Sequence, residues 1–477
     1  AAGAAATAVG ASALVGSVAW GAAAITSFTL TTAVNFGIMY GASKAIGAIT
    51  GKRSNFSNAR SGYSSPTYSF GPLQTQTSNL LPIPIVYGIV KMAGNMIYQR
   101  RDGSEVSHRL VAFADGEIEG LTDVKLNDLD ISTLPGCSWS GYNGLASQDV
   151  DSRVTGVTQS DKAKTVGGLN NLAYIGVTAR ASEKLNGSYN ITTIVHGSIV
   201  RVYTNPTTYF TAFTDNPAWC ILDFLTRYNG CGLSHDDINI SSFIEAAEYC
   251  DGIVDSQKRF TLNIVLDERK SNIEWLDDLM MCCRGYWYYQ NGKVSIKIEK
   301  QEISLQSFDE DNILIGSEKF WTLPREKKFD VCKVQYIDPN NQYARIYAIA
   351  EAETINNDPP IINEVEIFGV TNFNQASRLA WFYLNQAQLC DKYISFMTHK
   401  GGLDRTVGDI IEITSTFLGY SSKKMRIISL IERAEGQIEI TCKEYNSSLY
   451  GDMLGSAEPV VNTVTLEDPN LTPDDVT

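Results

Sequence analysis

The sequence lacks most of the residues and motifs that metal centres and common enzymes need. It contains only four histidines, and its nine cysteines are scattered without a C-x-x-C pair, which argues against a zinc site. The motifs G-x-S-x-G, H-E-x-x-H, G-x-G-x-x-G and the Walker lysine loop are all absent. The odd number of cysteines favours free, mostly buried thiols in a protein that folds in a reducing cytoplasm. We therefore expect no catalytic residue, no cofactor and no metal.

Charge is missing from the start of the chain, where Lys44 is the first charged residue. Two apolar runs, residues 4–25 and 28–46, are each about 20 residues long, which is enough for a helix to cross a bilayer. Residues 1–50 therefore predict either a transmembrane hairpin or a helical segment buried inside an assembly, where Ala and Gly permit close packing. A signal peptide fits less well because the start is not basic and the segment is too long. Because the chain begins at Ala1 rather than Met, we also expect residues upstream of it.

The remaining charge is acidic overall, with a net charge of −14 and a pI near 4.9. Binding to a phosphate backbone needs clustered Lys and Arg, so the chain is a poor candidate for gripping nucleic acid. An acidic surface is compatible with DNA that passes without sticking, since like charges repel, but it is also what solubility alone would require.

The body of the chain predicts an α+β protein in which strands predominate. Its 477 residues exceed one ordinary core, and we expect about two to four domains. Residues 51–79, rich in Ser, Asn, Gly and Pro, predict an extended arm, and the acidic stretch 451–477 predicts a linker. Alternating apolar residues predict strands at 85–96, 107–132, 198–203, 260–266, 294–298, 331–337, 409–414, 425–432 and 437–443.

Four helices are expected. Asn216 can cap the first, with Pro217 at its first position. Ser242 with Glu245 predicts a capping box for a second that ends near residue 251. Ser271 with Glu274 predicts a third, which runs to about residue 285. The fourth spans residues 374–390.

Several polar or aromatic groups were weighed as sites, and each has a simpler structural explanation. A solvated loop explains the acidic groups better than metal or acid–base chemistry does. A helix with one polar face explains the adjacent aspartates, and a place half in the core and half at a boundary explains the paired cysteines better than a redox pair does. Two strand faces, one buried and one at an interface, explain the aromatic run better than a sugar platform does. These groups are His235-Asp236-Asp237, Asp309-Glu310-Asp311, Asp277-Asp278, Cys282-Cys283 and Tyr286-Trp287-Tyr288-Tyr289.

A series of short motifs spans residues 82–446. They are Pro82–Gly88 with Gly94–Ile97, Leu110–Leu121 with Leu126–Asp128, Asn216–Leu225 with Gly230–Leu233, Phe243–Asp251, Arg259–Asn263, Asp330–Tyr336 with Asp338-Pro339, Val407–Asp409 and Glu444–Asn446. In content and order, these motifs resemble the tail tip attachment (J-type) proteins, the central tail hubs of lambda-like long-tailed bacteriophages. The chain departs from the family at Ala114–Glu117, where Cys and Pro are missing. It also lacks the long C-terminal receptor-binding part, so host recognition is not carried over.

The resemblance implies a multidomain hub with two tube-like β domains that form a ring and two peripheral inserted domains. We map hub domain I, tube-like, to residues 80–113 and 190–212, and hub domain II, an insertion, to 114–189. Hub domain III, which contains helices, maps to 215–317, and hub domain IV, tube-like with helix 374–390, to 318–450.

The resemblance also implies a structural protein and not an enzyme. It predicts a homotrimer that is made in the host cytoplasm and lies at the tail tip of the virion. The trimer is expected to continue the tail tube and to close it before infection. It is also expected to take part in host attachment and genome ejection at the cell envelope. Its expected protein partners are the distal tail protein or tube ring, the C-terminus of the tape measure protein, other tail-tip proteins and a fibre. Residues 1–50 are expected to contact the host membrane. Double-stranded DNA is expected to pass through the lumen without specific binding. The alternatives are a membrane-anchored bacterial surface or secretion-channel protein and a tail-associated cell-wall hydrolase that uses a carboxylate such as Glu117 or Glu310.

Overall fold

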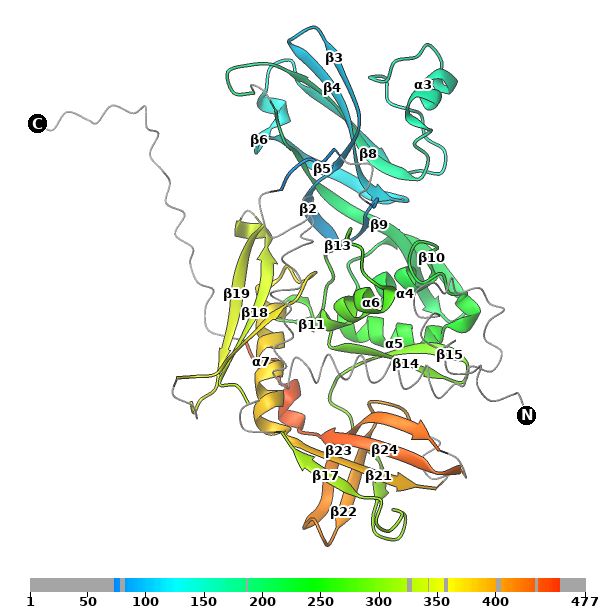
Figure 1. Cartoon of the computed structure of the whole chain (residues 1–477), viewed down its shortest axis with the longest axis vertical. Coiled ribbons are helices and arrows are strands. Elements are labelled where there is room, and N and C mark those ends of the chain that lie inside the picture. The colour runs from blue at the N-terminus through cyan, green and yellow to red at the C-terminus, as the bar shows by residue number, and fades with distance from the viewer. Residues whose placement is uncertain are drawn as a thin grey trace, which may run out of the picture.

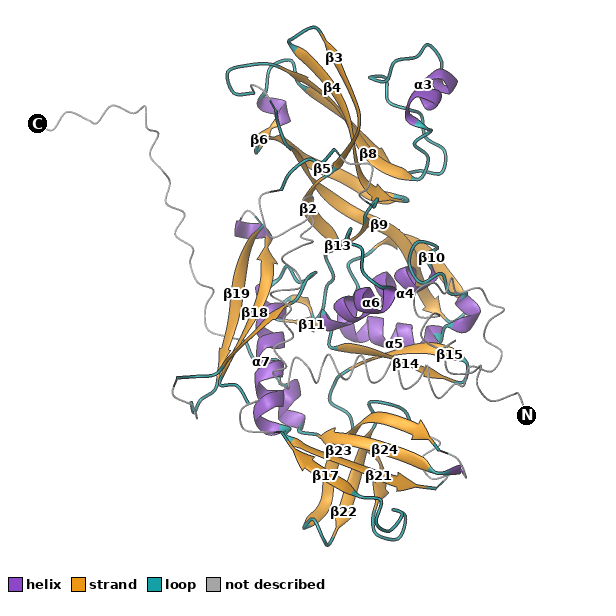
Figure 2. Cartoon of the chain, viewed as in Figure 1, coloured by secondary structure: helices purple, strands orange, loops and turns teal. Residues whose placement is uncertain are grey.

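The structure is a computed structural model that describes residues 73–77, 82–185, 188–323, 328–341, 343–355, 359–399, 405–433 and 436–454. Along its longest axis, β-sheets lie at both ends and most helices lie in the middle (Figures 1 and 2). The expected N-terminal helical segment 1–50, most of the arm 51–79 and residues 455–477 lie outside the described residues. Within the described part, none of the helices combines the length and apolarity needed to span a bilayer.

The upper end contains two antiparallel sheets. The first is formed by β2 (Ile89–Ala93), β5 (Ile118–Leu126), β6 (Leu129–Asp130), β9 (Ile191–Asn205) and β10 (Thr208–Phe213). The second has the order β3 (Asn95–Asp102), β4 (Val106–Asp115), β8 (Leu172–Arg180), β7 (Ser138–Asn143). Val111, Phe113 and Val195 belong to one apolar core that both sheets share. η1 (Ile131–Thr133) contributes Ile131 to this core. The surface helix α3 (Gln159–Val166) has no buried residue and packs on a separate small core that includes Leu110 and Tyr174.

The middle is helical and contains the largest core. It comprises α4 (Pro217–Thr226), η2 (His235–Asp237), α5 (Ile240–Asp251), α6 (Asn272–Met281), the short pair β11 (Ile253–Val254) and β12 (Gln257–Lys258), and the hairpin β14 (Gly285–Gln290) and β15 (Lys293–Ile298). β13 (Ile264–Leu266) pairs with β1 (Ile85–Tyr87), which ties the middle to the upper end. The same core continues under α7 (Phe373–Leu389), which packs on the sheet β19 (Ala344–Glu351), β18 (Val331–Asp338), β20 (Ile362–Glu366).

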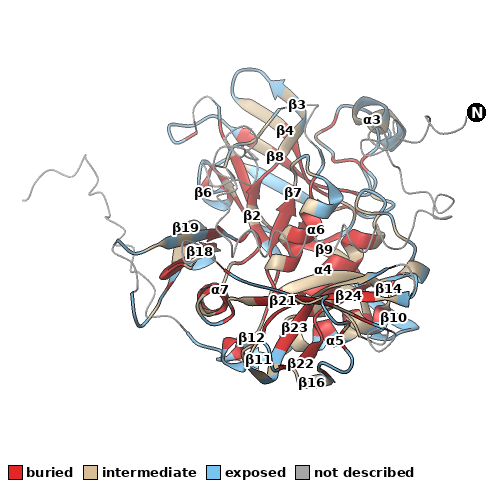
Figure 3. Ribbon diagram, turned by 60° about the horizontal axis from the view of Figure 1, so that its bottom comes forward, coloured by how far each residue is buried: buried red, intermediate tan, exposed pale blue. Residues whose placement is uncertain are grey.

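The lower end is a six-stranded sheet around a core of its own. Its order is β16 (Ser304–Phe308), β22 (Ile410–Ser415), β23 (Tyr420–Glu432), β24 (Ile438–Glu444), β21 (Lys392–Thr398), β17 (Lys319–Thr322). In Figure 3, where the ribbon is coloured by residue burial, buried residues follow β22 and β23 of this sheet as well as α4. Phe308, Phe396 and Ile440 are completely buried in this core. The short helices η4 (Pro339–Asn341) and η7 (Ser447–Tyr450) complete the described elements.

The predicted elements are largely present. Asn216 caps α4 through its side chain and Pro217 begins the helix, Ser271 and Glu274 form the expected capping box, and α7 lies within one residue of the expected range. The capping box at Ser242 was wrong, because α5 begins at Ile240 and the Ser242 hydroxyl donates to the Asn239 carbonyl instead. Only the last three residues of the expected strand 260–266 are a strand.

Strand pairing links segments that we expected in different domains. β4 belongs to the expected hub domain I, yet it pairs over most of its length with β8 in the expected insertion. β5, from the expected insertion, pairs with β9. The predominance of β-structure is confirmed, whereas the domain map remains a prediction.

Candidate functional site: the polar junctions between the sheets and the helical middle

The groups weighed as sites in the sequence do not come together. Within the described residues, no group of three or more His, Cys, Asp or Glu side chains could hold a metal ion. His235 accepts a hydrogen bond from Arg201 at 3.0 Å. The pKa of His235 is lowered, mainly by burial and also by the positive charge of Arg201. Glu310 accepts from the backbone of Thr416 at 2.8 Å, so it joins two loops. Glu117 is exposed at the other end of the molecule, between β4 and β5.

Helix α6 and the cysteines that follow it are more buried than the sequence predicts. Asp277 was expected on the polar side of the helix, which is wrong, because the residue is only 6% exposed. Its neighbour Asp278 pairs with Lys270 at 3.2 Å. Cys282 and Cys283 are both completely buried, so the expected place of one of them at a boundary was wrong. All nine cysteines are free thiols, and most of them are buried, as expected. Burial raises the pKa of the Cys282 thiol well above its usual value.

Polar side chains instead concentrate where the helical middle meets each sheet, and we call these places the upper and lower junctions. At the upper junction, the buried Tyr87 of β1 donates to the Asp223 carboxylate of α4 at 2.7 Å. Arg227, one turn further along α4, lies 3.4 Å from the same carboxylate. Burial raises the pKa of Asp223, and Arg227 and the Tyr87 hydroxyl oppose that rise.

Arg227 extends the upper junction to the turn between β4 and β5. Its Nη2 donates to the Asp115 carbonyl at 2.9 Å, and Asn229 donates to the Asp115 carboxylate at 2.9 Å. A Cβ at Gly116 would lie 2.3 Å from the same guanidinium nitrogen. The Asp115-Gly116 turn is therefore also a docking point for α4.

Gly88 brings β1 and the segment before β13 into direct contact. Its φ of +70° favours glycine, and a Cβ there would lie 2.1 Å from the Leu262 carbonyl oxygen. The Asn263 side chain accepts from the backbone of Ile89 at 2.7 Å and donates to Thr371 at 2.7 Å. One amide thus connects the upper sheet, β13 and the loop before α7.

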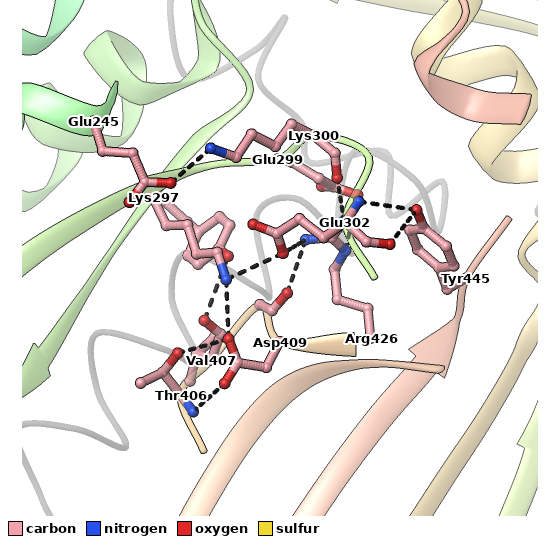
Figure 4. A network of polar contacts seen from close by, with 12 residues as sticks. Glu245, Lys297, Glu299, Lys300, Glu302, Thr406, Val407, Asp409, Arg426 and Tyr445 are labelled. Atoms are coloured by element: carbon pink, nitrogen blue, oxygen red, sulfur yellow. Dashed lines mark hydrogen bonds and ion pairs between the residues drawn. The ribbon is translucent and has the colours of Figure 1, made fainter. Parts of the chain in front are cut away.

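The lower junction is built around Arg426 of β23 (Figure 4). Its guanidinium donates to the carbonyls of Gly408 at 2.9 Å and Lys300 at 2.8 Å. It also donates to the Tyr450 hydroxyl at 3.0 Å, and its Nε is 3.6 Å from Glu299. Burial lowers the pKa of Arg426, but Glu299 and the nearby tyrosines outweigh that effect and raise it, so the group stays charged.

A second cation, Lys297 of β15, completes the lower junction. It binds Asp409 at 3.0 Å and Glu302 at 3.1 Å (Figure 4). Asp409 also accepts from the backbone of Thr406 at 2.8 Å, which fixes the turn that carries Gly408. These bonds hold the β14–β15 hairpin against the six-stranded sheet.

The aromatic run in β14 divides between the two sides of this hairpin. Tyr286 donates to the Val407 carbonyl at 3.4 Å and packs so closely on Gly408 that a Cβ there would meet its hydroxyl at 1.4 Å. Tyr288 lines a cavity of about 150 Å³ at the lower junction, and Trp287 packs against the large core. The run therefore divides between two faces as expected, but every residue of β14 is only half-buried, so neither face is fully buried. The interface lies within this chain.

The cavity at the lower junction does not offer free acid or base groups. Its charged lining consists of Glu245, Lys297, Lys300 and Glu302. Lys300 binds Glu245, and Lys297 binds Glu302. Because each carboxylate is paired with a cation, the arrangement suits a rigid joint better than proton transfer.

Lys443, on β24 beside Arg426, is also buried, but it lacks the hydrogen bonds that Arg426 makes. It is 6% exposed, and its Nζ has no hydrogen-bond partner among the described residues. Burial lowers its pKa from 10.5 to about 8. Between these two values the unfolded chain binds more protons than the folded chain, so this group makes stability rise with pH through that window.

We predict that Lys443→Met stabilises the protein by about 1–3 kcal/mol at pH 7, because it removes a buried charge without a partner. The gain should shrink as the pH rises from 8 past 10.5, because Lys443 then loses its proton first in the folded and then in the unfolded state. Urea denaturation at pH 7 and across this range measures the change. A variant that is less stable than the parent at pH 7 would show that Lys443 has a stabilising partner.

The family motifs coincide with the two junctions. Gly88, Asp115 and Asn263 belong to three of the motifs and meet at the upper junction, while Gly408 and Asp409 belong to another and form the lower one. The sequence did not predict the roles of Arg227, Lys297 and Arg426. Each of these side chains binds a partner more than 100 residues away in the chain, namely Asp115, Asp409 and Lys300. The motifs therefore encode the arrangement of the sheets and not a reaction centre.

Comparisons with known proteins agree with this interpretation. A family model described as putative phage tail protein matches residues 271–430. A tip attachment protein J of Escherichia phage SECphi27 is 25% identical over 244 residues, which are 47% of this chain and 20% of that relative. A chain from the virion of a native gene transfer agent particle shares the fold with a TM-score of 0.65 and 13% identity, over 91% of this chain and 99% of that one.

The motifs and these matches show that the chain is similar to phage tail proteins. Within that class, the resemblance to the J-type tip attachment proteins, which the motifs predicted, is confirmed. The chain spans about a fifth of the length of the tip attachment relative. The relatives are tail proteins, which agrees with the expectation that this chain is not an enzyme.

Proposed function

We propose that the chain is the structural hub at the tail tip of a long-tailed phage, where three copies form a ring that continues the tail tube. The observation that carries the proposal is the similarity to a tip attachment protein across 47% of the chain. The ring closes the tube before infection and takes part in host attachment and genome ejection. The five-stranded upper sheet and the six-stranded lower sheet are the walls in this proposal, and the two junctions set their relative orientation.

Two sheets end in strands that pair on one side only among the described residues, which supports an assembly of several copies. β10 and β17 each lie at the end of their strand order. Each carries two adjacent exposed aromatic residues, Tyr209-Phe210 and Phe320-Trp321. An exposed edge strand with large apolar side chains is a surface that pairs with another chain. In this proposal, the neighbours of the hub in the tail are the distal tail protein or tube ring, the C-terminus of the tape measure protein and other tail-tip proteins.

The net charge of −14 supports a passage for DNA. Like charge keeps a duplex from binding to the wall, so the genome passes without specific contacts. Residues 1–50 would reach the host membrane on ejection in this proposal. Particles that lack residues 1–46 and still eject DNA into cells at normal efficiency would refute that part.

Native mass spectrometry of the purified chain, with negative-stain images of the same sample, tests the assembly. We expect three copies in a ring with a central opening. Phe320→Glu should lower the fraction of trimer because it places a charge on the edge of β17. Phe417→Glu is the matched control, since Phe417 is 89% exposed in the turn between β22 and β23 and lies on no edge strand. A monomer under all conditions would contradict the proposal, and equal effects of the two variants would contradict the role of β17.

The two alternatives receive less support. A cell-wall hydrolase needs a positioned carboxylate pair, and Glu117 and Glu310 lie in loops of different sheets. A membrane-anchored surface or channel protein depends on residues 1–50 alone, which lie outside the described residues.

A further inference from the structure

Three arginines from separate elements meet beside α7. Arg259 follows β12, Arg284 follows α6, and Arg378 lies in α7 itself. Arg284 and Arg378 are only 8% and 5% exposed. Burial lowers the pKa of Arg378, and Arg259 and Arg284 lower it further while Asp452 opposes them. The cluster thus places several positive charges close together in a poorly hydrated position, which is unfavourable unless an anion binds there.

The anion is the carboxylate of Asp452, which follows η7. Arg259 Nη1 donates to both of its oxygens, at 2.6 Å and 2.8 Å. Arg378 Nε lies 3.9 Å from the same carboxylate, so two arginines share it. An arginine with a carboxylate is among the strongest polar pairs in proteins.

The chain around Asp452 follows one face of α7. Figure 1 shows η7 beside the lower part of this helix. The ring of Tyr450 packs on Phe382 at 6.2 Å, and the Asn385 amide lies 3.9 Å from the sulfur of Met453. Arg378, Phe382 and Asn385 are spaced four and three residues apart, which places them on the same helix face.

The arginine cluster is built to receive an acidic group. Within the described residues, the buried Nε atoms of Arg259 and Arg284 and the Nε and Nη1 atoms of Arg378 have no hydrogen-bond partner. Arg284 Nη2 donates to the Tyr249 hydroxyl at 3.3 Å, and Phe260 and Phe382 each lie 5.0 Å from its guanidinium carbon. Aromatic faces hold a guanidinium in place without neutralising it, so the cluster keeps positive charge for the carboxylate.

We propose that Arg259, Arg284 and Arg378 form a receptor for an acidic chain segment, and that residues 451–454 occupy it as an intramolecular latch through Asp452. The latch fixes the direction in which the chain leaves the body toward residues 455–477. The latch acts within one copy, so it stands or falls independently of the proposed ring.

Hydrogen exchange of the full chain, read by mass spectrometry on peptides that cover residues 447–454, tests the latch. Asp452→Asn keeps the shape of the side chain but removes its charge, and we expect exchange in 447–454 to become at least about tenfold faster while α7 and the sheets keep their protection. Glu105→Gln is the matched control, because Glu105 pairs with Arg180 on the surface at 3.2 Å, and it should leave these peptides unchanged.

A charge exchange separates the latch from a general loss of stability. Arg259→Asp and Asp452→Arg should each speed exchange in 447–454, and the double variant should recover part of the lost protection. Unchanged exchange in Asp452→Asn would overturn the proposal. So would an equal loss of protection throughout the body, or a double variant that exchanges as fast as the faster single variant.

Discussion

Replacing Arg426 with methionine should destabilise the protein by about 3–5 kcal/mol, the loss expected when one partner of a buried charged network is removed. Arg426 donates to two backbone carbonyls and to Tyr450, and its charge faces Glu299. Methionine fills a similar volume but donates nothing, so these buried acceptors and the carboxylate lose their partner. Urea denaturation followed by tryptophan fluorescence measures the change.

Arg433→Met is the control for this experiment. Arg433 lies in the loop that follows β23 and pairs with Glu439, but its side chain is 53% exposed. An exposed pair contributes little, so we expect a loss below about 1 kcal/mol. Similar effects of the two substitutions would show that the network around Arg426 does not hold the lower junction together.

Replacing Gly88 with alanine should cost about 3 kcal/mol or more. The new Cβ would lie 2.1 Å from the Leu262 carbonyl oxygen and 2.9 Å from the Cα of Asn263, and both are backbone atoms that cannot rotate away. Part of the cost comes from the φ of +70°, which disfavours any residue with a Cβ. Strand β1 must therefore move away from β13, and the pairing that ties the upper sheet to the helical middle is weakened.

Gly103→Ala separates the two contributions to that cost. Gly103 has a φ of +66°, and a Cβ there meets nothing within 4 Å. We expect a loss of about 1–2 kcal/mol from the backbone conformation alone. Thermal unfolding of both variants compares them, and a Gly88→Ala loss no larger than that of Gly103→Ala would contradict the close packing at the upper junction.

Local signals in the sequence predicted local structure well. Ser271 and Glu274 form the expected capping box, whereas the same pattern at Ser242 does not start a helix, because Ile240 is buried and extends the helix backward. Helix α3 was missed although Thr158 and Asp161 form a capping box, since it buries no residue and shows no apolar periodicity. β23 begins five residues before its expected start because polar residues there pair with β22.

The junctions could not be predicted from local patterns, because their partners are distant in the chain. Tyr87 and Asp223 are 136 residues apart, and Lys297 and Asp409 are 112 residues apart. A single sequence gives no sign of such pairs. The motifs identified the family and marked several of these positions, but the reason for Gly88 or Gly408 appears only when the opposing chain segment is in place.

Immunolabelling of intact particles tests the central claim most directly. Antibody against this chain, applied to purified virions and viewed by negative stain, should label the tip of the tail and nothing else. Label on the capsid or along the tail shaft, or a chain recovered from cell membranes without particles, would contradict a hub at the tail tip.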